Sequence, residues 1–69
     1  MDRMPVSSSS VASVGYDPDT LTLEVEYSGG RVYLYANVPK EVYDELMASS
    51  SVGGYLARNV KNLYPYSRL

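Results

Sequence analysis

The chain has 69 residues, a net charge of −2, no cysteine and no histidine. This length allows one small domain with a modest core, and the missing cysteine excludes disulfides and thiolate metal sites. The missing histidine removes the commonest general base and metal ligand, and an acidic chain argues against sequence-independent binding of duplex DNA.

Residues 1–10 are expected to form an extended lead-in, because Pro5 disfavours helix at Met4 and four serines follow at 7–10. The serines are interpreted as capping or backbone-pairing residues, since no nearby base can activate a hydroxyl. The N-terminus lacks the apolar region of a secretory signal peptide, and no apolar run is long enough to span a membrane. We therefore expect a cytoplasmic protein, in the producing cell or in an infected host.

Three strands are predicted next, as an antiparallel meander. Residues 11–16 form the first, with Ala12, Val14 and Tyr16 on one face, and residues 17–20 form a Pro-containing turn. Residues 20–27 and 31–38 alternate with period two on either side of Gly29-Gly30, which predicts a β-hairpin with a two-residue type I′ turn.

That turn fixes a register in which Val25 faces Leu34 and Glu24 faces Tyr35. The predicted core face then consists of Leu21, Leu23, Val25, Tyr27, Val32, Leu34, Ala36 and Val38. The predicted polar face consists of Thr22, Glu24, Glu26, Arg31, Tyr33, Tyr35 and Asn37. A slip by one residue would exchange the faces of one strand, so the register should be firm.

Two helices are predicted after the sheet. The first covers residues 39–49, because Pro39 suits a first helical turn and Val42, Leu46 and Met47 form an apolar stripe. The second has its N-cap among residues 49–51 and extends to about residue 63. Gly53-Gly54 in its first turn indicates a close backbone approach, either helix–helix packing, which is favoured, or an anion site. Residues 64–69 are an extended segment expected to dock back on the domain.

The predicted fold is therefore α+β: a three-stranded antiparallel β-meander followed by two α-helices packed on its Leu21/Leu23/Val25/Leu34 face. The short sequences Val-Ser-Ser, Val-Gly-Tyr-Asp (14–17), Leu-Glu-Val (23–25), Tyr-Leu-Tyr (33–35), Val-Pro (38–39) and Tyr-Pro-Tyr (64–66) occur in an order that resembles the KTSC domain. That family is named for its occurrence at the C-terminus of some lysyl-tRNA synthetases. The resemblance implies one domain over residues 1–69, suggests RNA binding, and carries over no catalytic residue.

The candidate ligand-binding residues are Arg31, Tyr33, Tyr35, Arg58 and Lys61. Tyr33 and Tyr35 would project from one face about 6.5–7 Å apart, a spacing suited to stacked nucleobases. Arg31 shares their predicted face, while Glu24 and Glu26 would sit opposite the tyrosines and repel phosphate. Arg58 and Lys61 would share a helical face in a stretch without acidic residues, where an anion meets least repulsion.

The function is interpreted as a non-catalytic, cofactor-free module that binds single-stranded RNA or a small nucleotide-derived signal. The small ligand needs only a pocket with one or two cations. Oligomeric phage proteins that sequester nucleotide signals offer a comparison, by functional analogy alone. The alternative is a protein-interaction or homo-oligomerisation module, most simply a two-fold dimer, using the Tyr-rich sheet face. In a third interpretation, the C-terminal Tyr-Pro-Tyr segment covers Tyr33 and Tyr35, which are then purely structural.

Overall fold

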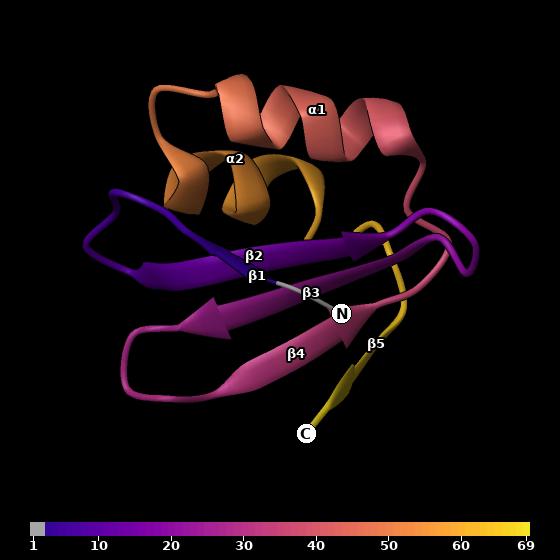
Figure 1. Ribbon diagram of the computed structural model, residues 1–69, viewed down its shortest axis with the longest axis horizontal. Coiled ribbons are helices and arrows are strands. Elements are labelled where there is room, and N and C mark those ends of the chain that lie inside the picture. Colours follow the sequence, from indigo (N-terminus) through magenta and orange to yellow (C-terminus); the bar gives the residue numbers. More distant parts are fainter. Residues whose placement is uncertain (1–2) are drawn as a thin grey trace.

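The computed structural model describes residues 3–69 as one antiparallel sheet with two helices on one face (Figure 1). Its strands pair in the order β1-β2-β3-β4-β5. The elements are β1 (Arg3–Pro5), β2 (Val11–Asp17), β3 (Thr22–Tyr27), β4 (Val32–Tyr35), α1 (Lys40–Ala48), α2 (Val52–Asn59) and β5 (Tyr66–Arg68). The α+β class, the three central strands and the two helices agree with the sequence prediction. Among residues 3–69, no helix is long and apolar enough to cross a membrane.

The sheet has five strands, so the predicted number of three is wrong. The two additional strands lie at its edges: β1 pairs with β2, and β5 pairs with β4. Each is three residues long and exposed throughout, and so short a strand produces no alternating pattern in the sequence. The C-terminal segment docks back on the domain as predicted, and it does so by joining the sheet.

The predicted register of the central hairpin is also wrong, by one residue. Tyr27 donates its N–H to the carbonyl of Arg31 at 2.8 Å, and Gly30 donates to the carbonyl of Tyr27 at 3.0 Å, which closes a three-residue loop. Both loop glycines have positive φ, +99° and +93°, values that a two-residue turn would also require. The glycine pair therefore indicates a hairpin but does not distinguish the two loop lengths.

The slip exchanges the two faces of β4. Leu23 pairs with Tyr35 and Val25 pairs with Tyr33, so both tyrosines lie on the helix-covered side. Val32 and Leu34, predicted as core, are half-buried on the opposite face. β4 permits this exchange because Val and Leu alternate with tyrosines whose rings are also apolar, so either set can face the core.

The core lies between the sheet and the helices. Its fully buried members are Val11, Val14, Leu23, Val25, Tyr35, Val38, Leu46, Leu56 and Val60. Val11 and Val14 both face inward because the register of β2 shifts between Val11 and Ser13, which is a β-bulge. The bulge leaves Ala12 exposed, contrary to the prediction that it shares the face of Val14. Leu21, also predicted as core, is 42% exposed at a positive φ of 55°.

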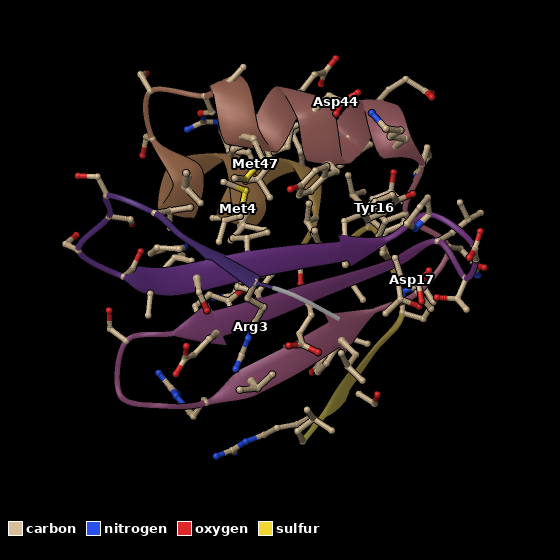
Figure 2. All side chains as sticks on the ribbon, in the orientation of Figure 1. Arg3, Met4, Tyr16, Asp17, Asp44 and Met47 are labelled. Carbon is tan, nitrogen blue, oxygen red and sulfur yellow. The ribbon has the colours of Figure 1, made fainter. Side chains whose placement is uncertain are left out.

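The helices hold close to their predicted positions. α1 lies within the predicted 39–49, and Tyr16, between β2 and α1 in Figure 2, stacks on Tyr43 of α1 with 5.1 Å between ring centroids. The Ser51 hydroxyl caps α2 by accepting the Gly54 N–H at 3.2 Å, as predicted. α2 ends at Asn59, so the predicted extension to residue 63 is wrong.

The close backbone approach predicted at Gly53 exists, but it is not the helix–helix packing that the sequence analysis favours. A Cβ at Gly53 would collide with the hydroxyl of Ser10, so the glycine accommodates the N-terminal loop, not the other helix.

Candidate functional site

Four tyrosines form a continuous cluster on the inner face of the sheet, at its β4–β5 edge. The tyrosine cluster, as we call it, consists of Tyr27, Tyr33, Tyr35 and Tyr66. Tyr33 is central: it stacks on Tyr66 at 5.4 Å between ring centroids, meets Tyr27 edge-on at 5.5 Å and lies 6.3 Å from Tyr35. In Figure 1 both helices lie nearest β2, while β4 and β5 form the opposite edge. The cluster therefore continues the core to a side of the domain that the helices leave open.

Exposure increases across the cluster, from its buried member to its rim. Tyr35 is 1% exposed, Tyr27 and Tyr33 are half-buried, and Tyr66 is 59% exposed. The hydroxyls of Tyr27 and Tyr35 hydrogen-bond to each other at 2.8 Å. Burial raises the pKa of both groups above the ordinary tyrosine value, and the hydrogen bond to Tyr27 raises the pKa of Tyr35 further. The inner rings are thus structural, and the outer rings meet solvent.

A pocket of about 290 Å³ opens at the rim of the cluster. It is lined by Tyr33, Tyr35, Lys61, Asn62 and Tyr66. A smaller adjoining pocket of about 60 Å³ is lined by Tyr27, Arg31, Tyr33 and Lys61. Lys61 belongs to both pockets, and its ammonium lies 5.7 Å from the centroid of the Tyr27 ring, a cation–π distance. The site therefore combines aromatic rings, an amide and two cations.

The charge around these pockets is positive. Arg68 pairs with Tyr33 across β4 and β5, so its side chain also lies on the cluster's face. Within the part of the chain that the structure describes, no acidic residue lines either pocket. This arrangement favours an anionic ligand over a cationic one.

Glu24 and Glu26, predicted to lie beside the tyrosines, lie on the opposite face of the sheet because of the register slip. Arg3 of β1 pairs with Glu24 at 3.0 Å and with Glu26 at 3.9 Å, and its side chain extends away from the helices (Figure 2). Ser13 also donates its hydroxyl to Glu26 at 2.9 Å. The phosphate repulsion expected from these two carboxylates is therefore absent from the tyrosine face.

Four of the five candidate residues come together. Tyr33, Tyr35 and Lys61 line the larger pocket, and Arg31 joins Tyr33 and Lys61 in the smaller one. Arg58 lines neither pocket, and its guanidinium lies beside Gly54. Because α2 ends at Asn59, Arg58 and Lys61 do not occupy one helical face as predicted.

Sequence reasoning missed Tyr27, Asn62, Tyr66 and Arg68. The sequence prediction places Tyr27 on the core face but Tyr33 and Tyr35 on the polar face, because its register is wrong by one residue. The docking predicted for the C-terminal Tyr-Pro-Tyr segment was the available signal for Tyr66. The third interpretation is correct to the extent that Tyr66 stacks on Tyr33 and Tyr35 is buried. Nothing in the sequence alone connects Asn62 or Arg68 to the cluster.

Comparisons with known proteins agree on one family. The family model described as the KTSC domain matches residues 7–64. An uncharacterized protein of Stutzerimonas stutzeri is 41% identical over 70 residues, which cover 100% of this chain and 99% of that protein. The lysine–tRNA ligase of a Nostoc species is 37% identical over 54 residues, which cover 78% of this chain but 10% of the ligase. The crystal structure of a KTSC domain protein from Yersinia pestis superposes with a TM-score of 0.93 at 33% identity, covering 99% of this chain and 96% of that one.

Proposed function

This chain belongs to the KTSC domain family, and from that premise we propose that it is a non-catalytic module that binds a nucleobase-containing ligand at the tyrosine cluster. One observation carries the proposal: the pocket of Tyr33, Tyr35 and Tyr66 places aromatic rings next to Lys61 and Asn62. A nucleotide offers the matching chemistry, because it joins a flat aromatic base to an anionic phosphate.

The base is assigned to the rim of the cluster. Tyr66 is 59% exposed, so part of its ring is free to stack, whereas Tyr35 is enclosed and contributes only a wall. Stacking of one base on an exposed aromatic ring contributes about 1–3 kcal/mol. The amide of Asn62 provides both a donor and an acceptor, which suits the edge of a base.

The phosphate is assigned to Lys61 and Arg31, the cations that line the two adjoining pockets. A small nucleotide-derived signal is favoured over single-stranded RNA, because the basic residues gather at one spot and form no track along the sheet. Short RNA is the alternative, and the similarity to a lysine–tRNA ligase supports it. Either ligand fits the expectation of a cytoplasmic protein.

Isothermal titration with AMP, a cyclic dinucleotide and a five-nucleotide single-stranded RNA tests this proposal and ranks the ligand classes. We expect Lys61→Glu to weaken binding by about tenfold or more, which corresponds to about 1.4 kcal/mol. Arg58→Glu is the matched control, since it reverses the same charge outside both pockets, and it should change the affinity by less than about twofold. The absence of binding by all three probes, or equal losses in the two variants, would contradict the assignment.

A protein-interaction or homo-oligomerisation module is the second candidate. The observation in its favour is a pair of exposed apolar side chains that line one pocket: Leu63 is 67% exposed and Tyr66 is 59% exposed. Exposed apolar side chains that gather in one region are typical of contact surfaces.

A further inference from the structure

The outer edge of β5 carries hydrogen-bonding groups that no other strand within residues 3–69 uses. β5 is the last strand of the sheet, with β4 on one side only. Leu69 donates its N–H to Val32 at 2.9 Å, and the carbonyl of Pro65 accepts from Ala36 at 2.8 Å, so both groups point toward β4. Because direction alternates along an antiparallel strand, Ser67 also points toward β4, while Tyr66 and Arg68 direct their N–H and C=O groups outward.

The other edge of the sheet, at β1, is less suited to pairing, although Arg3 also directs its N–H and C=O outward by the same alternation. Val6 donates its N–H toward β2, to the carbonyl of Ala12, so the preceding residue, Pro5, has its nitrogen on the outer side. Proline has no N–H to offer there, and proline at an edge strand discourages further pairing. In the described chain, β5 is therefore the edge suited to accept another strand.

We propose that β5 pairs antiparallel with the same strand of a second copy of this chain, about a two-fold axis at Ser67. In this register the outward groups of Tyr66 bond to those of Arg68 of the partner subunit, and the reverse pair forms by symmetry. The two sheets then continue across the interface as one. A second copy is favoured over an unrelated peptide because β5 is complementary to itself on both faces.

On the inner face, Tyr66 lies opposite Arg68 of the partner subunit, with Cβ atoms about 5 Å apart, which places a guanidinium beside an exposed ring. On the outer face, the exposed Leu69 lies opposite Pro65 of the partner subunit. Pro65 forms part of an apolar groove together with Leu34 and Ala36. Pairing thus covers the exposed Leu69.

The pairing also completes the candidate site, and this consequence rests on the proposed function. Tyr66 forms the open rim of the pocket, so Arg68 of the partner subunit adds a cation beside the ring on which a base would stack. Each of the two sites in the dimer would then contain residues from both subunits.

A single cysteine tests the pairing without any ligand, because the natural chain has none. At the axis, the two Ser67 residues form a non-hydrogen-bonded pair with Cα atoms about 4.5 Å apart, within disulfide range. We expect Ser67→Cys to form a disulfide-linked dimer quantitatively under mild oxidation. Ser50→Cys, at an exposed position between the helices, is the control, and most of its chains should remain without an intermolecular disulfide. Equal cross-linking of the two variants would overturn the register.

Light scattering tests the interface in the unmodified protein at about 100 µM. We expect twice the chain mass of 7.6 kDa for the natural protein and for Arg68→Ala, which keeps its backbone N–H. Arg68→Pro removes an outward N–H while leaving the bonds to β4, so it should be a monomer with an unchanged circular dichroism spectrum. A monomeric natural protein, or an Arg68→Pro variant that is folded and dimeric, would overturn the proposal. Neither readout uses a nucleotide, so failure here is distinct from failure of the proposed function.

Discussion

The inner face of the sheet is divided into two regions that are built differently. Under the helices, Val14, Leu23 and Val25 are aliphatic and fully buried. Toward the β4–β5 edge, the same face carries the tyrosine cluster, whose exposure rises from 1% at Tyr35 to 59% at Tyr66. Two helices of nine and eight residues cover only part of the sheet, and tyrosine suits the remainder because its ring packs while its hydroxyl meets water or another hydroxyl. One continuous face therefore serves both as core and as candidate binding surface.

The largest expected change is in the free energy of unfolding, and it comes from the region that the helices cover. Leu23 is fully buried, so Leu23→Ala should lower the free energy of unfolding by about 2–5 kcal/mol, through lost burial and a residual cavity. Urea unfolding followed by circular dichroism measures this change. Leu63→Ala is the matched control, because the same side chain is 67% exposed there, and it should change stability by less than about 0.5 kcal/mol. Similar losses of stability in the two variants would contradict the assignment of Leu23 to the core and Leu63 to the surface.

The next effect is on stability at high pH, to which the buried side of the cluster contributes together with Tyr16 and Tyr55, whose pKa values are also raised. The pKa values of Tyr27 and Tyr35 are raised in the folded protein, so the unfolded chain loses these protons first. Their contribution to stability is complete below the ordinary tyrosine pKa of 10.0 and is lost progressively above it. Urea unfolding at several pH values up to about 11 should show this decline beginning near pH 10. A constant free energy of unfolding across that range would contradict the burial of the two hydroxyls.

A smaller effect is expected from removing one of these hydroxyls. Tyr35→Phe should lower the free energy of unfolding by about 1 kcal/mol, because Tyr27 loses the partner of its 2.8 Å hydrogen bond. Tyr66→Phe, at the exposed end of the same cluster, should have almost no effect on stability, because that side chain is largely exposed to water. Thermal unfolding of the two variants measures this difference. Equal effects would mean that the gradient of exposure across the cluster has no energetic consequence.

The smallest effect on stability, and a large one on binding, is expected at the rim. Tyr66→Ala removes a ring that is 59% exposed, so the loss of stability should be below about 1 kcal/mol. If a base stacks on that ring, the affinity for the best nucleotide should fall by about 1–3 kcal/mol, or roughly fivefold to more than a hundredfold. Titration calorimetry together with urea unfolding separates the two quantities. A variant that is strongly destabilised but binds normally would make Tyr66 part of the scaffold.

The candidate site shows how far sequence reasoning can reach. Tyr33, Tyr35, Lys61 and Arg31 were identified from their chemistry, and the structure brings them together. The predicted register, however, places the tyrosines on a polar face beside two glutamates, and the observed pairing contradicts it. Sequence reasoning misses Tyr27 and Tyr66 as members of the site because the cluster depends on which residues pair between neighbouring strands. The spacing of residues along the sequence does not give these pairings.

The sequence by itself determined the α+β class, the three central strands, α1, the Ser51 cap of α2 and the docking of the C-terminal segment. These features follow from local signals: period-two alternation, an apolar helical stripe, a capping hydroxyl and tyrosines that need cover. Only the tertiary structure decided the register of β4, the bulge at Ala12 and the two edge strands. A strand whose two faces are both apolar gives alternation no preferred direction, and a glycine pair fits loops of either length. The face that β4 presents is settled only when its neighbours pack against it.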